Sequence, residues 1–178
     1  QMCIRDSEGY VEKDRPLDPV TDDDLEGQPK AYQGMRVHNN KVDHDSVILP
    51  LEPTGEQRLN QRRHYCANVT MIDQKVGEIM EQLEAQGYLE NSIIIFTSDH
   101  GDCLTDHGHS QKWTMYEQVT RVPLIVWAAD GRFGKGRQVD EMVSLFDVGP
   151  TILEMAGCEV PNHFSARSLL PALEEKSD

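Results

Sequence analysis

The feature that most constrains the fold is a short apolar run that stops abruptly at a group of polar residues. Residues 93–97 read IIIFT, and such β-branched and aromatic runs are typical of a parallel strand buried on both faces. Ser98, Asp99, His100 and Gly101 follow directly. In open α/β sheets, ligands bind at the carboxyl ends of the strands, and a glycine lets the chain turn sharply there. The sequence therefore predicts an α/β fold with a ligand site at this point.

Asp99 and His100 are the candidate metal ligands of this stretch. Divalent cations that prefer oxygen bind carboxylates, and a neutral imidazole can fill one further position. Asp and Gly are also common wherever a strand ends, so the pair alone is a weak signal. The same loop also carries five further ionisable side chains: Asp102, Asp106, His107, His109 and Lys112. A purely structural turn does not need so many, and burying them without an ion to pair with would be costly.

Composition limits the classes of partner. The chain has 178 residues and a net charge of -14, which argues against nucleic acid or an anionic membrane as a partner, because both require a basic surface. No apolar stretch approaches the roughly 18 residues that span a bilayer. The 4 cysteines match no zinc spacing, so we expect free thiols.

The first third of the chain differs in character from the rest. We interpret residues 1–56 as an irregular polar segment, because they lack periodicity and contain prolines, and residues 1–7 as a truncated or extraneous leader. A long helix is predicted over residues 56–86, capped by Gly87. Its apolar stripe, expected to pack against a sheet, contains Tyr65, Val69, Ile72, Val76, Ile79, Met80 and Leu83.

Further elements follow the acidic and histidine-rich loop. A short helix is predicted around residues 114–119 and a second strand over 122–127. Asp147 is placed as the N-cap of another helix, which Gly157 closes. Residues 57–178 are thus interpreted as a folded part that is distinct from residues 1–56.

Several separated blocks, in this order, resemble the carboxyl-terminal half of the sulfatase catalytic domain, within the alkaline phosphatase-like superfamily. The blocks read IIIFTSDHGD, DHGH, a lysine followed by MYEQVTRVPLIVW, SLFDVGPTILEMAG and SLLPAL. The likeness runs from about Gln61 to Leu173. It implies a three-layer α/β/α fold with a mostly parallel sheet, incomplete in these residues.

The resemblance also implies roles for particular residues. Asp99 and His100 fall on the metal ligands of the motif, with Ca²⁺ as the expected ion and Mn²⁺ as the alternative. Lys112 falls on the catalytic lysine that contacts the sulfate or phosphate oxygens. His107 and His109 are weaker candidates for substrate binding, since they could instead hold the loop. The implied substrate is a small-molecule or glycan sulfate ester, and the family favours a periplasmic or secreted location over the cytoplasm.

One departure from the family pattern bears on activity. The nucleophile of the family is a formylglycine made in a C/S-x-P-x-R motif, and no such motif occurs here: Cys3 begins CIRDS and Cys66 begins CANVT. We therefore expect an inactive fragment of a metal-dependent sulfatase. Two alternatives remain at this stage: a phosphodiesterase or phosphonate monoester hydrolase of the same superfamily, and a non-catalytic metal-binding module.

Overall fold

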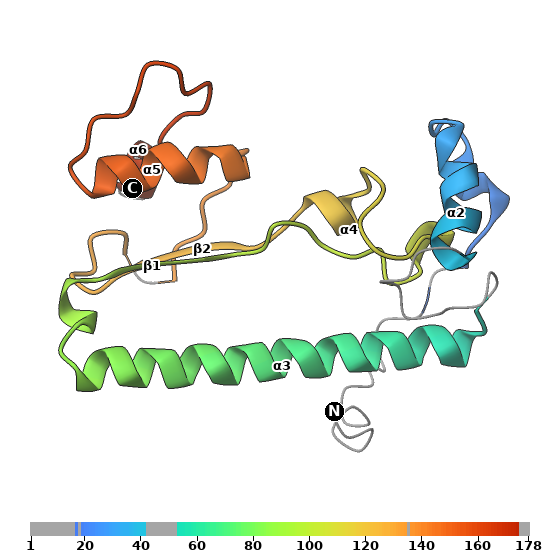
Figure 1. Cartoon of the computed structure of the whole chain (residues 1–178), viewed down its shortest axis with the longest axis horizontal. Coiled ribbons are helices and arrows are strands. Elements are labelled where there is room, and N and C mark those ends of the chain that lie inside the picture. Colours follow the sequence, from blue (N-terminus) through green and yellow to red (C-terminus); the bar gives the residue numbers. More distant parts are fainter. Residues whose placement is uncertain (1–16, 18, 42–52, 135, 175–178) are drawn as a thin grey trace. The chain divides into compact units, whose positions relative to one another are not determined.

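The computed structural model describes residues 17, 19–41, 53–134 and 136–174, and it divides the chain into two compact units. Unit 1 comprises the described residues up to Leu83 together with His100–Pro123, and unit 2 comprises Glu84–Asp99 and the described residues from Leu124 on. Figure 1 labels their helices and strands. No helix of the described residues is long and apolar enough to cross a membrane.

The longest element is helix α3 (Gly55–Ala85) of 31 residues. A capping box begins it: the Thr54 hydroxyl accepts a hydrogen bond from the Gln57 N–H, and the Gln57 side chain accepts one from the Thr54 N–H. Gly87 has a left-handed φ of 72°, and its N–H donates to the Glu84 carbonyl, as a glycine cap does. The predicted helix over 56–86 is therefore confirmed.

The apolar stripe of α3 is not buried as predicted. Val69 remains 51% exposed and Ile79 59%. The helix up to Leu83 belongs to unit 1, whereas the two-stranded sheet of the described residues belongs to unit 2. Packing of this stripe against a sheet therefore stays a prediction.

That sheet pairs β1 (Ile93–Thr97) with β2 (Leu124–Ala128) in antiparallel register, Ile93 opposite Ala128 and Thr97 opposite Leu124 (Figure 1). The prediction of strands in both runs is confirmed. The prediction that residues 93–97 form a parallel strand buried on both faces is wrong for this structure, because β2 is their only partner among the described residues and Phe96 and Thr97 are exposed.

Unit 2 is completed by short helices around a small core. The turn η5 (Leu145–Asp147) leads into α5 (Val148–Met155), and α6 (Leu170–Glu174) lies near the carboxyl end. The Asp147 carboxylate is buried and accepts hydrogen bonds from the N–H groups of Ser144 and Arg167. Asp147 occupies the N-cap position of α5, as predicted, but its side chain makes no capping hydrogen bond there and instead completes the capping box of η5, whose N-cap is Ser144.

Unit 1 contains a second helix that the sequence analysis missed. The prediction of an irregular segment over 1–56 is wrong for α2 (Ala31–Lys41) and for the turn η2 (Asp22–Leu25). The remaining elements of this unit are the turn η4 (Asp106–Gly108) and the short helix α4 (Glu117–Thr120). The core of unit 1 is centred on the loop that joins β1 to α4, because Cys103, Thr105, His109, Ser110 and Thr114 of this loop are buried.

Candidate functional site

The predicted site residues from His100 to Lys112 all lie on this loop, residues 100–112. Its first turn packs tightly against α4: the Gly101 N–H donates to the Val119 carbonyl at 2.8 Å. A Cβ atom at Gly101 would lie 1.9 Å from the Gln118 carbonyl oxygen. Glycine is needed here because two backbone segments approach closely. A left-handed backbone is not the reason, since Gly101 is not among the glycines with positive φ.

The loop has an unusual backbone. Leu104, Thr105, His107 and Gln111 all have φ between 47° and 72°, the left-handed region, which costs a non-glycine residue about 1 kcal/mol or more. The carboxylate of Asp102 offsets part of this cost, because it accepts hydrogen bonds from the N–H groups of Leu104 at 2.7 Å and Gln111 at 3.2 Å. Such strain persists only where surrounding contacts enforce it.

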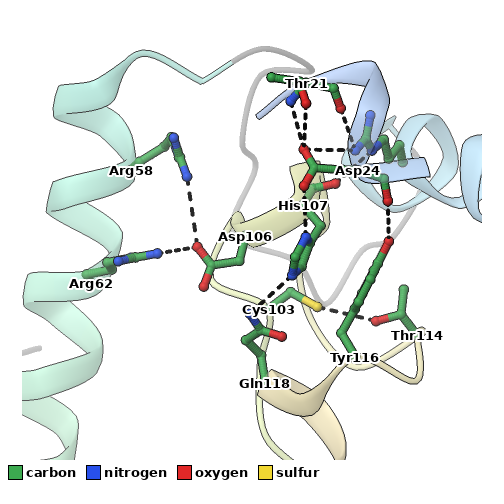
Figure 2. Close-up of polar contacts among 11 residues, drawn as sticks. Thr21, Asp24, Arg58, Arg62, Cys103, Asp106, His107, Thr114, Tyr116 and Gln118 are labelled. Atoms are coloured by element: carbon green, nitrogen blue, oxygen red, sulfur yellow. Dashed lines mark hydrogen bonds and ion pairs between the residues drawn. The ribbon is translucent and has the colours of Figure 1, made fainter. Parts of the chain in front are cut away.

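Two arginines of α3 hold one side of the loop. The Asp106 carboxylate forms an ion pair with Arg62, and the Arg58 guanidinium lies 3.9 Å from the same oxygen (Figure 2). Arg58 Nε also donates to the Thr105 hydroxyl at 2.9 Å. Because Arg58 is only 7% exposed, these contacts are shielded from water and are stronger than surface ion pairs.

His107 is held from the opposite side. Its Nδ1 lies 2.9 Å from an Asp24 carboxylate oxygen and its Nε2 lies 3.2 Å from the Gln118 amide nitrogen, while the ring stacks on Tyr116 with centroids 4.1 Å apart (Figure 2). An acceptor carboxylate requires a proton on Nδ1, which leaves Nε2 to accept from the amide. Both ring nitrogens are therefore engaged within the protein, an arrangement that favours loop-holding over substrate contact.

Asp24 is the counterpart of His107. Partial burial by itself would raise the pKa of Asp24, but hydrogen bonds from the Thr21 N–H and His107, together with the positive charge of Arg36, hold the pKa below its ordinary value. The carboxylate is therefore ionised at neutral pH. Arg36 also ties this group to the loop, because its Nε donates to the His107 carbonyl at 2.7 Å.

His109 lies inside the unit. This residue is 1% exposed, and neither ring nitrogen has a hydrogen-bond partner among the described residues. Burial, reinforced by the charges of Arg36 and His107, lowers the pKa of His109 to about 4. The imidazole is neutral at pH 7. The substrate contact of His109 stays a prediction, because the residue is almost fully buried but also lines a pocket of unit 1.

The buried His109 leads to a prediction about acid stability. An unfolded histidine has a pKa near 6.5, so between pH 7.5 and pH 5 the unfolded chain takes up a proton that the folded chain does not. Folding should lose about 2 kcal/mol over this range, measurable as the change in the free energy of unfolding in urea at the two pH values. His109→Phe should remove most of this change, whereas His163→Gln, at an exposed position, should keep it. An unchanged slope in His109→Phe would contradict the assignment.

Lys112 and the two metal candidates are more exposed. Lys112 is on the surface, with its ammonium 6.0 Å from the centre of the Trp113 ring. His100 Nδ1 lies 2.7 Å from the Gly101 carbonyl oxygen, so Nδ1 carries the proton and the lone pair lies on Nε2. Asp99 is exposed and belongs to unit 2, whereas His100 begins the loop of unit 1.

The described residues do not assemble a complete metal site. Among them, no group of three or more His, Cys, Asp or Glu side chains is placed to hold an ion. A calcium site needs 6–8 oxygen ligands, and Asp99 with His100 would supply only a small part of that set. We therefore derive no chemical step through a metal.

A pocket of about 720 Å³ in unit 1 is lined in part by the loop itself, through Thr105, Gly108 and His109. Its wall includes Arg36 and Arg58, together with His109. Neither Lys112 nor His100 lines it, so this pocket and the predicted catalytic lysine are separate features.

Sequence reasoning missed several residues that organise the loop. Arg62 and Asp24 lie in strongly polar stretches that carry no local sign of a partner, yet both contact residues more than 40 positions away in sequence. The spacing of Arg58 and Arg62, four residues apart on one helix, places both side chains on the same face. That spacing was a usable signal, but nothing local identified Asp106 as their partner.

The sequence matches a protein-family model and is similar to several curated proteins. The family model described as Sulfatase matches residues 6–158. Arylsulfatase K of Xenopus laevis is 36% identical over 127 residues, which cover 71% of this chain and 23% of the relative. N-acetylglucosamine-6-O-sulfatase of Bacteroides thetaiotaomicron is 38% identical over 118 residues, covering 64% of this chain and 20% of the relative. The chain thus spans less than a quarter of the length of these relatives.

A similar solved structure is the phosphonate monoester hydrolase SpPMH from Silicibacter pomeroyi. It matches with a TM-score of 0.77 and 28% sequence identity, covering 92% of this chain and 32% of that one. The helices and the small sheet of the described residues are consistent with an incomplete part of this α/β fold. With the family model matching most of its length, the chain belongs to the sulfatase family.

Proposed function

We propose that these residues form part of a metal-dependent sulfatase that hydrolyses sulfate esters. The observation that carries the proposal is the match of the Sulfatase family model over residues 6–158. The position of Lys112 is compatible with it, because an exposed ammonium lies at the end of a loop whose backbone is held by many contacts. We also propose that the complete fold has three α/β/α layers with a mostly parallel sheet.

Lys112 has a clear chemical role in this proposal. Hydrolysis of a sulfate ester keeps negative charge on the sulfuryl oxygens and develops it on the leaving oxygen. A fixed ammonium that reaches the leaving oxygen as well as the sulfuryl oxygens meets more negative charge in the transition state than in the ground state, and therefore stabilises the transition state more. Asp99 and His100 would contribute two ligands to a divalent cation, Ca²⁺ in our proposal and Mn²⁺ as the alternative, which would supply Lewis-acid chemistry. The other ligands and the formylglycine would come from residues outside this sequence.

The proposed substrate is a glycan or small-molecule sulfate ester. The relative from Bacteroides thetaiotaomicron is named as a sulfatase of N-acetylglucosamine, and arylsulfatase K is named for aryl esters. A second candidate function is phosphonate monoester hydrolysis, which the structural match to SpPMH supports. Lysine is a point charge that suits sulfuryl and phosphoryl oxygens alike, so Lys112 does not separate the two.

The proposal is tested by comparing two proteins: the present 178 residues and the product of the longest reading frame that encodes them. Each is incubated with 4-nitrophenyl sulfate, with the phenylphosphonate monoester of 4-nitrophenol, and with each substrate after treatment with a chelator. We expect the 178 residues to show no turnover, because they contain no C/S-x-P-x-R motif. The longer product should hydrolyse the sulfate, and chelation should slow it.

Each other outcome has a distinct meaning. Preference of the longer product for the phosphonate would favour the second candidate function. Turnover by the 178 residues alone would refute the argument from the missing nucleophile. A longer product with a C/S-x-P-x-R motif but no hydrolysis of either ester would favour the non-catalytic alternative.

A further inference from the structure

The strained loop of residues 100–112 is held by contacts from two separate parts of the chain. Helix α3 supplies Arg58 and Arg62, which meet Asp106. The segment before α3 supplies Asp24 and Arg36, which meet the ring and the carbonyl of His107. Asp106 and His107, adjacent residues of one turn, thus contact charged groups on opposite sides of the turn (Figure 2).

These contacts act on the positions where the backbone is least favourable. His107 has φ 54°, and Thr105, whose hydroxyl accepts from Arg58, has φ 72°. Left-handed φ values at non-glycine residues revert to ordinary ones unless neighbouring groups enforce them. The charged contacts therefore supply part of the enforcement, alongside the Asp102 hydrogen bonds and the stacking of His107 on Tyr116.

The order of the turn extends along the chain toward Lys112. The carbonyl of Gln111, the residue before Lys112, accepts a hydrogen bond from the Cys103 N–H at 3.0 Å, and the N–H of Gln111 donates to Asp102. Gln111 also has a left-handed φ of 62°. The direction in which the chain presents Lys112 is therefore fixed by the same closed turn that contains Asp106 and His107.

We propose that Asp106 and His107 are positioning residues. Their contacts with Arg58, Arg62 and Asp24 fix the conformation of the loop that presents Lys112. The inference rests on the proposed function only for the role of Lys112 in hydrolysis. Neither residue needs to touch the substrate. Their role is to hold the lysine ammonium in one place before the ester arrives, because a group that is already oriented loses no freedom during the reaction.

The first test measures loop order directly in the 178-residue chain. Amide hydrogen exchange is followed in Arg62→Ala and in the matched control Arg63→Ala. Arg63 is next to Arg62 in sequence but pairs with the exposed Glu56. Loss of one charge-assisted contact should speed exchange of the peptide covering residues 103–112 by about tenfold in Arg62→Ala. Arg63→Ala should leave that peptide unchanged, and α3 itself should be equally protected in both. Equal loop exchange in the two variants would overturn the proposal.

The second test asks whether the contacts act through Lys112. In the product of the longest reading frame, Arg62→Ala should lower kcat/KM for 4-nitrophenyl sulfate by about tenfold, but by less than about twofold when Lys112→Ala is already present. Arg62→Lys, which keeps the charge, should recover part of the loss. A loss of equal size in both backgrounds would show that Arg62 acts on general stability and would overturn the positioning role.

The two tests separate this inference from the proposed function. If the longer product does not hydrolyse sulfate esters, the proposed function and the role of Lys112 fail together, while the exchange result still decides whether the contacts order the loop. If it hydrolyses the ester and the loop exchanges equally in both variants, only the positioning role fails. For a variant that does not fold, Asp106→Asn replaces Arg62→Ala, because it removes the same ion pair with a smaller change of shape.

Discussion

Gly101→Ala is expected to cost unit 1 more than about 3 kcal/mol of stability, at the upper end of what a single added methyl group does. The added Cβ would lie 1.9 Å from the carbonyl oxygen of Gln118 and 3.0 Å from its carbonyl carbon. Both atoms are backbone, so no side chain can rotate away to make room. The loop and α4 must separate, which breaks the hydrogen bond from the Gly101 N–H to the Val119 carbonyl.

The measurement is urea unfolding of the 178-residue chain, with Gly77→Ala as the matched control. A Cβ at Gly77 would meet nothing within 4 Å, and Gly77 lies inside α3, where alanine stabilises a helix by about 0.5–1 kcal/mol relative to glycine. The same chemical change should therefore destabilise at one position and stabilise at the other. A Gly101→Ala protein as stable as the wild type would show that loop 100–112 and α4 do not approach as described.

Local signals explain why some elements could be predicted. Helix α3 follows from apolar spacing, and its ends follow from Thr54 and Gly87, residues whose capping roles depend only on their neighbours in sequence. The runs that form β1 and β2 were recognisable for the same reason. Their antiparallel pairing was not, because a run such as IIIFT has the same composition in either kind of sheet.

Long-range contacts explain what sequence reasoning missed. The pair of Asp106 with Arg62 and the pair of His107 with Asp24 join residues 44 and 83 positions apart, and no local pattern selects one acidic residue among many. The helix α2 was missed because it is only 11 residues long and its few apolar side chains, those of Ala31, Tyr32, Met35 and Val37, are embedded in a polar segment, too short a stripe to indicate a helix. Its contribution is made instead by two side chains that reach the loop: Arg36, and Tyr32, whose hydroxyl accepts from the Met115 N–H.

For some loop residues, the role implied by the family resemblance differs from the contacts that the residue makes in the structure. The motif order assigned five residues to chemistry, yet the structure engages His107 in internal contacts and buries His109. Lys112 is the most exposed of the loop's predicted substrate contacts, and the His107 side chain is 30% exposed. The many ionisable groups that indicate a site in this stretch thus include some, such as His107, that hold the loop and others, such as Lys112, that remain candidates for chemistry.

Lys112→Ala is expected to lower kcat/KM for sulfate esters by about 10²–10³ in the product of the longest reading frame, which corresponds to about 2.7–4 kcal/mol of transition-state stabilisation. The ammonium is the charge that the proposed mechanism places beside the sulfuryl oxygens. Because the negative charge on the adjacent leaving oxygen grows as the ester bond breaks, the larger part of the loss should appear in kcat rather than in KM. Lys112→Arg keeps the charge and should retain more activity than the alanine variant, though less than the wild type, because the planar guanidinium places its donors differently.

Lys75→Ala is the matched control for this measurement. Lys75 is also an exposed lysine, but it lies on α3 and pairs with Glu78 at 2.8 Å. Its loss should leave kcat/KM within about twofold of the wild type, since exposed ion pairs contribute little. Both variants remove one positive charge, so a general electrostatic effect on substrate encounter would lower both equally. Equal activities of Lys112→Ala and Lys75→Ala would remove Lys112 from the mechanism, and with it the reason to regard loop 100–112 as part of the reaction centre.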